Sequence, residues 1–461
     1  MRPSAPRWTR ESGKVGSVIG APEGVRWDRN ISRTGVRGEP CWPKQTPLPS
    51  PGSTLQRRGT MTSPLPRPFL PFEMERWQST WEHRVEINLS ESGVHPLSTR
   101  ELLEIGRSVA DDEVEALSRS LLDLRHEYGQ SNGSDRLRAR IAALYPGGDP
   151  AGVVVTQGGA EANLVSLWRL LEQAGDWAAL LPTYMQVPGL VRNLGGTLHP
   201  VLLRESAGWQ PDPDEVEATF RAGARVLLVT NPNNPTGAVI EADRMEAIVA
   251  SAARHGSWIV ADEVYSGAEL DGDPTPTVFG QYPRVICTHS LSKAYGLPGL
   301  RLGWAISSPE MAADLWARTD YTSIAPATLS DALATLALEP SIRSGVLKRT
   351  RTILNTNRAL FGEWVDSLEG RARFHPPEAG AIALVNYRAR VSSMEIAERL
   401  RSEFGVLVVP GAHFGLEGTL RLGFGNPAEE LREGLDRIGT VLRAFDSDAP
   451  ADVPSTHGDP S

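Results

Sequence analysis

Short apolar runs alternate with helical patterns through the middle of the chain. Several of the runs are continuously apolar, which is typical of strands that are buried on both faces. Apolar positions at helical spacing lie between most of them, for example over 160–173 and 242–255. This alternation predicts an α/β fold in which helices flank both faces of a mostly parallel sheet. The seven predicted strands begin at Val153, Ala178, Leu198, Val226, Trp258, Val285 and Leu302.

The pattern changes in the last third of the chain, where a smaller α+β unit is predicted. A long helical pattern covers 329–368, and the strand-like runs A-I-A-L-V-N-Y, G-V-L-V-V-P-G and T-L-R-L-G-F follow it. Another helical pattern covers 427–445. We therefore expect a large domain over 109–324 and a small domain over 325–445, to which an amino-terminal segment over 61–108 contributes.

The two ends of the chain show no such periodicity. Residues 1–60 are rich in Pro, Gly, Arg and Ser, and they lack the apolar core of a signal peptide. We interpret them as a disordered extension and expect translation to start at Met61, where the composition becomes ordinary. Residues 446–461 form a polar, Pro-containing stretch that we interpret as a second disordered tail.

Composition excludes several classes of protein. The 461 residues carry a formal net charge of −9 with a pI near 5.6, so a nucleic-acid surface has no electrostatic support. Cys41 and Cys287 lie far apart without a CxxC partner, which argues against a disulfide scaffold and fits a reducing cytoplasm. No run approaches the roughly 20 apolar residues of a membrane helix.

Polar residues follow four of the predicted strands. Their segments are Q-G-G-A-E-A, N-P-N-N-P-T-G, D-E-V-Y and S-L-S-K, in chain order. Each has an ordinary interpretation alone, as a helix start, a turn, first-turn acids or a solvated lysine. In an open α/β sheet, however, ligands bind beyond the carboxyl ends of the strands, so the four segments are expected to meet in one crevice.

Together these segments suit pyridoxal 5′-phosphate (PLP). Lys293 supplies the amine that holds the cofactor aldehyde as a Schiff base, and Asp262 supplies an acid for the ring nitrogen. Glycines between Lys293 and Arg301 let the backbone wrap closely around the phosphate. The other expected cofactor contacts are Asn234 and Tyr265 at the ring hydroxyl, Tyr184 on the ring face, and Gly159, Ala160, Ser290 and Arg301 at the phosphate.

From about 72 to 445 the sequence resembles the class I/II aminotransferases, which are fold-type I PLP enzymes. The motifs that carry the resemblance are N-P-N-N-P-T-G, A-D-E-V-Y and S-L-S-K-A-Y-G-L-P-G-L-R-L-G-W. The resemblance implies that Lys293 is the Schiff-base residue and proton shuttle, that Asp262 pairs with the pyridine nitrogen, and that Tyr265 belongs to the same catalytic group. It also implies that Arg421, in T-L-R-L-G-F, binds the substrate α-carboxylate.

The resemblance extends to the assembly and to the substrate side. Tyr128, in E-Y-G-Q-S-N-G-S-D-R-L-R, matches a residue that reaches the phosphate of a neighbouring subunit, which implies a homodimer with shared active sites. Gly93, in S-E-S-G-V-H-P, matches the segment that lines the substrate site, although this spacer is not the usual glycine-acid-proline one. Ala160 stands where many relatives carry Ser or Thr. We consider His95, His126 and His413 either as groups near the substrate or as packing and surface histidines.

Three functions are compatible with these residues. Transamination between an α-amino acid and a 2-oxo acid through a Lys293 aldimine is favoured, because it needs Lys293 alone as the proton shuttle. Segments such as G-V-L-V-V-P-G-A-H-F-G also resemble capreomycidine synthase, so a β-eliminating lyase or cyclase is the alternative. A non-catalytic ligand-sensing domain is the third, although residues 1–60 cannot supply the basic DNA-binding domain that such sensors carry. The motifs leave the amino-acid substrate open.

Overall fold

The computed structural model describes residues 69–173, 175–271 and 274–447. The expected disordered extension over 1–60 and the expected start at Met61 lie outside the described residues. A tail was expected over 446–461. Residues 446 and 447 belong instead to the last helix, and the rest of the expected tail lies outside the described residues.

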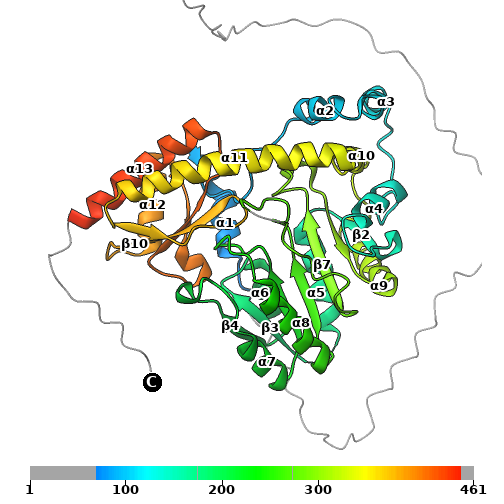
Figure 1. The fold of residues 1–461 in the computed structure, drawn as a ribbon, viewed down its shortest axis with the longest axis horizontal. Helices are drawn as coiled ribbons and strands as arrows, with labels where there is room; N and C mark the ends of the chain where they lie inside the picture. Colours follow the sequence, from blue (N-terminus) through cyan, green and yellow to red (C-terminus); the bar gives the residue numbers. More distant parts are fainter. Residues whose placement is uncertain (1–68, 174, 272–273, 448–461) are drawn as a thin grey trace, which may run out of the picture. The chain divides into compact units, whose positions relative to one another are not determined.

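A seven-stranded sheet forms the larger half of the described chain, and all seven predicted strands are present in it (Figure 1). The order across the sheet is β2-β8-β7-β6-β5-β3-β4, and only β8 runs antiparallel to its neighbours. The predicted α/β fold with a mostly parallel sheet is therefore confirmed. The strands are β2 (Val153–Thr156), β3 (Asp176–Leu181), β4 (Leu198–Leu202), β5 (Ala224–Thr230), β6 (Trp258–Asp262), β7 (Val285–Ser290) and β8 (Gly303–Ile306).

Strand β5 shows how helices on both faces bury this sheet. Its residues Val226 and Leu228 pack into one apolar cluster, and the alternating residues Leu227 and Val229 pack into another. The first cluster is completed by α5 (Gly159–Leu171), α6 (Gln186–Asn193) and α9 (Pro309–Thr319). The second receives side chains from α4 (Asp135–Ala142), α7 (Pro213–Arg221) and α8 (Ala242–His255).

A four-stranded antiparallel sheet forms the core of the smaller half, in the order β12-β13-β10-β9. The predicted strand over 405–411 is divided at Val408 between β11 and β12, and β11 instead pairs in parallel with β1. β9 and the helix α12 have no counterpart among our predictions. The bounds are β1 (Ile87–Asn88), β9 (Ala372–Phe374), β10 (Ile382–Tyr387), β11 (Val406–Leu407), β12 (Val409–Pro410), β13 (Thr419–Gly423), α12 (Ser393–Phe404) and α13 (Ala428–Ser447).

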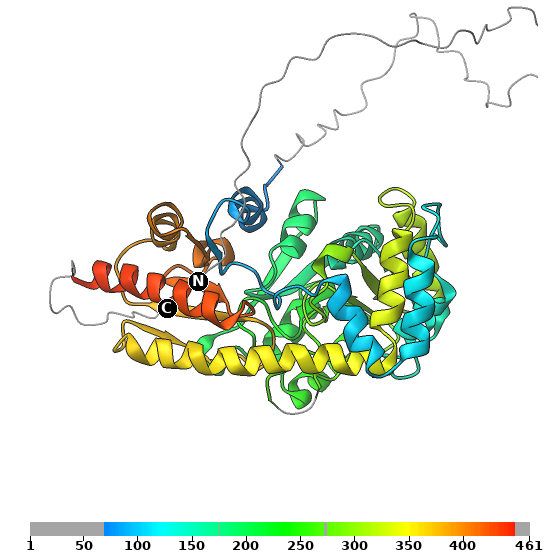
Figure 2. The same cartoon turned by 90° about the horizontal axis from the view of Figure 1, so that it is seen from above.

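The single long helix predicted over 329–368 is two helices, α10 (Thr328–Ala337) and α11 (Pro340–Ser367). Pro340 occupies the first turn of α11, where its missing N–H costs nothing, and it cannot continue the preceding helix. From there α11 extends to the small sheet, where it packs against α13 (Figure 2). The remaining helices are α1 (Glu73–Trp81), α2 (Thr99–Arg107) and α3 (Asp111–Leu121).

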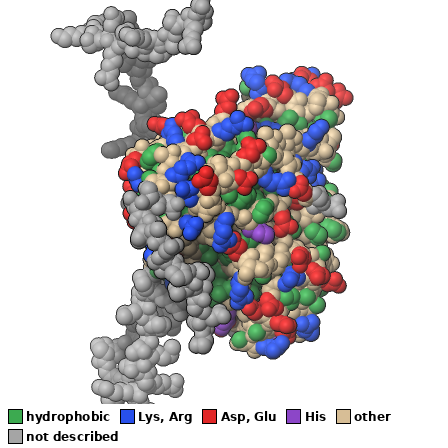
Figure 3. All heavy atoms as spheres, turned by 60° about the vertical axis from the view of Figure 1, so that its left-hand side comes forward, with side chains coloured by type: hydrophobic (Ala, Val, Ile, Leu, Met, Phe, Trp, Pro, Cys, Tyr) green, Lys and Arg blue, Asp and Glu red, His purple; other side chains and the backbone are tan. Residues whose placement is uncertain are grey.

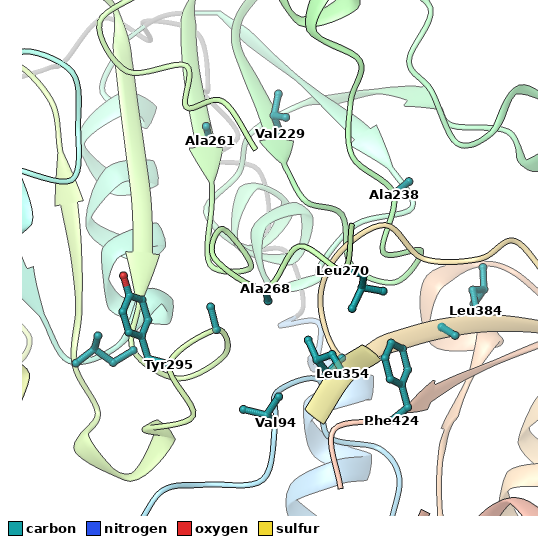
Figure 4. Packing of buried hydrophobic residues seen from close by; sticks show 14 of the residues in the cluster. Val94, Val229, Ala238, Ala261, Ala268, Leu270, Tyr295, Leu354, Leu384 and Phe424 are labelled. Carbon is teal, nitrogen blue, oxygen red and sulfur yellow. The ribbon is translucent and has the colours of Figure 1, made fainter. Parts of the chain in front are cut away.

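One apolar cluster joins the two sheets. Figure 4 shows Val229 and Ala261 from the large sheet in the same cluster as Leu384 and Phe424 from the small one, with Leu354 of α11 beside Phe424. The small sheet is thus packed against the large one, so side chains from both can face one site.

One face of the molecule shows how charged side chains are distributed. On the face shown in Figure 3, basic and acidic side chains are interspersed. None of the described helices is long and apolar enough to cross a membrane. Within the same part of the chain, no group of three or more His, Cys, Asp or Glu is placed to hold a metal ion.

Candidate active site

The polar segments at the strand ends meet as the sequence predicts. Asp262 ends β6, and in the sheet it pairs with Thr230 at the end of β5 and with Thr288 in β7. Beside them lies a cavity of about 370 Å³. Ten of the twelve predicted site residues line it, namely Gly159, Ala160, Tyr184, Asn234, Asp262, Tyr265, Ser290, Lys293, Arg301 and Arg421.

Lys293 lies in the turn that follows β7, and its side chain is 28% exposed in the cavity wall. Its Nζ lies 3.9 Å from Oε2 of Glu91. The chain uses arginine for nearly all of its basic positions and contains only four lysines, Lys14, Lys44, Lys293 and Lys348. Lys348 is exposed on α11, so Lys293 is the one lysine of the described residues that faces the cavity.

Gly93 does not line the cavity but packs directly behind Lys293. A Cβ added to Gly93 would lie 3.1 Å from the Ser292 carbonyl oxygen and 3.4 Å from Lys293 Cα. The neighbouring residues Glu91 and Ser92 do line the cavity. The segment around Gly93 therefore reaches the site as predicted, through its neighbours rather than through Gly93 itself.

Asp262 is buried and held by a chain of hydrogen bonds. Asn163 donates from Nδ2 to Asp262 Oδ2 at 3.0 Å, and Thr288 donates to Asn163 Oδ1 at 2.8 Å. Burial raises the pKa of Asp262 to about 6, while the bonds from Asn163 and from the Val264 N–H oppose the rise. The carboxylate is therefore ionised at neutral pH. Our sequence analysis missed Asn163, although it lies one turn after Gly159 on helix α5.

The amino-terminal end of α5 forms a cradle with Arg301. Gly158, the residue before the helix, has φ of +81°, and a Cβ added to it would lie 2.5 Å from Arg301 Nη2. No side chain caps this helix end, so its first N–H groups face the cavity beside a guanidinium. Ser290 and Ser292 add hydroxyls, and Ser292 was not predicted. This donor set suits a phosphate, even though Ala160 lacks a hydroxyl.

Arg421 in β13 lies in the cavity wall from the side of the small sheet and is fully buried. It donates from Nη1 to Asn234 Oδ1 at 3.1 Å and from Nη2 to the Ser90 carbonyl oxygen at 2.5 Å. Its Nε has no partner, and it forms no ion pair with any described residue. Burial lowers the pKa of Arg421. A buried guanidinium without a paired anion is costly, so the site is suited to receive a carboxylate.

Two tyrosines lie in the cavity wall. Tyr184 packs edge-on against Phe72, with ring centroids 5.3 Å apart, and burial raises its pKa. Tyr265 is buried beside Gly380, where an added Cβ would lie 3.1 Å from the Tyr265 ring. Both rings are thus fixed by packing, as expected of groups that position a flat ligand.

Tyr128 and the three histidines lie outside the cavity. Tyr128 is 82% exposed between α3 and α4, so the expectation that it serves a neighbouring subunit stays a prediction. His95 lies 3.2 Å from the Gly425 carbonyl oxygen through Nδ1, and His126 is exposed. His413 packs against Trp77, and burial lowers its pKa to about 4. The structure favours the packing and surface interpretation for these histidines.

The cavity wall also contains residues that our sequence analysis missed. They come from α1 and from the segment after β1, and most of them are polar. These residues are Met74, Glu75, Gln78, Glu82, Glu91 and Ser92. Helical spacing in α1 and the S-E-S segment were the only signals that could have indicated them.

Comparisons with known proteins agree with this geometry. The model of the family "Aminotransferase class I and II" matches residues 96–438. The chain is 30% identical to capreomycidine synthase of Streptomyces vinaceus over 83% of this chain and 97% of that protein. It is 28% identical to aspartate/prephenate aminotransferase of Thermus thermophilus over 71% and 86%. A solved PLP-dependent aminotransferase from Streptococcus suis superposes with a TM-score of 0.76 at 30% identity, over 83% of this chain and 100% of that one.

These findings confirm the resemblance, the fold type and the cofactor inferred from the motifs. The chain belongs to the class I and II aminotransferase family, whose members depend on pyridoxal 5′-phosphate.

Proposed function

We propose that this chain is a PLP-dependent aminotransferase that moves an amino group from an α-amino acid to a 2-oxo acid. The observation that carries the proposal is the convergence of Lys293, Asp262 and Arg421 on one cavity. They offer an amine, a buried carboxylate and a buried guanidinium, which are the groups that amino-group transfer from an α-amino acid requires.

The residues around the cavity fit the cofactor. The uncapped end of α5, Arg301 and the two serines would hold the phosphate, and ionised Asp262 would face the ring nitrogen. Asn234 and Tyr265 would hydrogen-bond the ring hydroxyl, and Tyr184 would cover the ring face. When bound, PLP supplies the electron-withdrawing ring that makes the substrate α-proton acidic and stores the amino group between half-reactions.

The chain's own groups then bind, orient and move a proton. Arg421 fixes the substrate by its α-carboxylate, and Nη1 is held for this by Asn234. Lys293 Nζ would remove the proton from the substrate α-carbon and deliver it to the cofactor side, because amino-group transfer leaves that carbon without its proton. Asn163 keeps Asp262 oriented, so that its charge does not have to reorganise during the reaction.

The half-reaction tests the proposed function. Purified holoenzyme is mixed with one amino-acid donor at a time, without any 2-oxo acid. We expect at least one donor to convert the bound cofactor to pyridoxamine 5′-phosphate with release of one keto acid per site, followed by absorbance and chromatography. A panel in which no donor does so would contradict transamination.

A second function, β-elimination or cyclisation, is favoured by two observations. The similarity to capreomycidine synthase covers 97% of that protein. In addition, the carboxyl group of Glu91 lies 3.9 Å from Lys293 Nζ, so a second polar group stands beside the proposed proton carrier. The same experiment separates the two functions, because a lyase would consume a β-substituted amino acid without an acceptor and without converting the cofactor.

We further propose that the enzyme is a homodimer of the cytoplasm. The exposed Tyr128 supports the dimer, because the family's corresponding residue reaches a neighbouring subunit. The sparse cysteines, of which Cys287 is buried and free, support a reducing compartment. Sedimentation of the active holoenzyme as a monomer would contradict the dimer.

A further inference from the structure

Three carboxylates border the mouth of the cavity. Glu75 and Glu82 lie seven residues apart in and directly after α1, with Gln78 between them, so all three project from one face of that helix. Glu91 joins them from the segment after β1. The opposite side of α1 is fixed to the small sheet, because Trp77 Nε1 donates to the Val408 carbonyl oxygen at 2.9 Å.

Few hydrogen-bond donors or basic side chains lie close enough to offset the negative charge of these three carboxylates. None of the three accepts a hydrogen bond from another described residue, and the nearest basic side chains are His83 at 3.5 Å from Glu82 and Lys293 at 3.9 Å from Glu91. Burial, and then repulsion from Glu91, raises the pKa of Glu82. Glu82 also stands at the carboxyl end of α1, where the helix dipole disfavours a negative charge. Structural stability does not explain a carboxylate at this position.

The other end of the substrate is already assigned. The Nε of the buried Arg421 lacks a partner, and this residue lies in the same cavity wall. An amino acid whose α-carboxylate binds Arg421 and whose α-carbon faces Lys293 has one substituent left, its side chain. The charged lining residues that remain for this side chain are Glu75, Glu82 and Glu91, and the uncharged polar ones are Gln78, Ser92 and Thr230.

We propose that the substrate is an α-amino acid with a cationic side chain, a guanidinium or an ammonium group, which Glu75, Glu82 and Glu91 bind at the mouth of the cavity. The inference rests on the proposed function in taking an α-amino acid as the substrate. Lys293 no longer offers its positive charge to Glu91 once it is engaged by the cofactor, so the holoenzyme presents an even more negative mouth to a ligand. A positively charged substrate side chain would offset the negative charge of the three carboxylates.

Binding to the holoenzyme tests the proposal, with arginine and citrulline as the probes. The two amino acids have nearly the same shape, but citrulline carries a neutral ureido group. Dissociation constants are measured from the change in cofactor absorbance and by calorimetry, so no turnover is needed. We expect arginine to bind about tenfold more tightly than citrulline, as for a charge-assisted contact. We expect a similar preference for ornithine over norvaline.

Paired variants assign the preference to the carboxylates. In the double variant Glu75→Gln, Glu82→Gln the ratio of arginine to citrulline affinity should fall to about twofold or less, while the affinity for alanine stays unchanged. Glu73→Gln is the matched control, because Glu73 lies on the same helix but outside the cavity lining. An unchanged cofactor spectrum verifies that the double variant is folded.

The outcomes separate this proposal from the proposed function. Arginine-selective binding without amino-group transfer would leave the cationic substrate intact and remove the transaminase. Equal binding of arginine and citrulline, a preference that survives in the double variant, or failure of arginine, ornithine and lysine to bind would overturn the cationic substrate, even if neutral donors were transaminated.

Discussion

The two ends of the cavity are built in different ways. At the cofactor end, Asp262 and Ser290 are buried at the ends of neighbouring strands, and the sheet fixes their separation. At the mouth, Glu75 and Glu91 are exposed on a short helix and on the segment that follows β1. In the function we propose, the first end would hold the groups for the reaction, and the second would hold the groups that bind the substrate side chain. Substitutions at the mouth can therefore change the substrate without disturbing the chemistry.

The segment that contains Ser90 and Gly93 connects the two ends of the cavity. Gln78 of α1 donates from Nε2 to the Ser90 carbonyl oxygen at 2.8 Å, and Arg421 donates to the same oxygen. The segment that contains Ser90 then packs against Lys293 through Gly93. Variants at each end should thus affect different kinetic quantities, and the predictions below use this difference.

The largest effect is expected at Lys293. Lys293→Ala should lower turnover by about a thousandfold or more, because it removes both the attachment of the cofactor and the proton carrier. The variant should still fold and should still bind PLP without a covalent bond, since the α5 cradle is intact. Lys348→Ala, at the exposed lysine of α11, is the control and should keep full activity.

Asp262→Asn should lower turnover by about a hundredfold or more, because it removes the charge beside the cofactor ring. For the same variant we also expect a difference in how the stability of the cofactor-free protein depends on pH. Burial raises the pKa of Asp262 from its ordinary value of 3.8 to about 6, so protonation stabilises the folded state. This contribution is fully present below pH 3.8 and is lost as the pH rises through 6.

The melting temperature of the cofactor-free Asp262→Asn variant, relative to the parent protein, should therefore rise between pH 4 and pH 7. Differential scanning calorimetry at several pH values measures it. A relative melting temperature that falls over this range would show that burial does not destabilise the ionised carboxylate.

Removing the Arg421 guanidinium should lower the efficiency of the enzyme with its amino-acid substrate. Arg421→Gln should lower kcat/KM by about a hundredfold, as for the loss of a buried, charge-assisted contact. The affinity for PLP should change little. The effect should nearly disappear for an amine that lacks the α-carboxylate. Equal losses for the amino acid and for the amine would mean that Arg421 acts through the fold rather than on the carboxylate.

The smallest of these effects is expected at the phosphate cradle. Gly158→Ala places a Cβ 2.5 Å from Arg301 Nη2, at a residue with φ of +81°. We expect PLP to bind about tenfold more weakly, while saturating PLP restores most of the turnover. Equilibrium dialysis measures the affinity. Unchanged affinity would show that Arg301 can move away at no cost.

The cofactor end could be predicted from the sequence because contiguous motifs encode it. Each strand end has its polar residues directly after an apolar run, so Asp262 and Lys293 could be assigned without knowing the packing. The seven strands were predicted for the same reason. Asn163 was missed because it is one of several polar residues in α5, and nothing in the sequence distinguishes it from the others.

The mouth could not be predicted in this way. Glu75, Glu82 and Glu91 look like ordinary surface acids in the sequence. The packing of α1 against the small sheet brings Glu75 and Glu82 to the cavity, and the segment after β1 brings Glu91. The break between α10 and α11 shows a similar limit. The apolar spacing continues across Pro340, so periodicity alone indicates one helix, while the proline ends it.

The most direct test of the account is the position of the cofactor on the chain. The holoenzyme is reduced with borohydride, digested and analysed by peptide mass spectrometry. Because the sequence contains only four lysines, each can be assigned to its own peptide. We predict the mass of the reduced cofactor on Lys293 and on no other residue, at one per chain. A reduced cofactor on Lys348, or on no lysine at all in a protein that binds PLP, would contradict the assignment of this cavity as the active site.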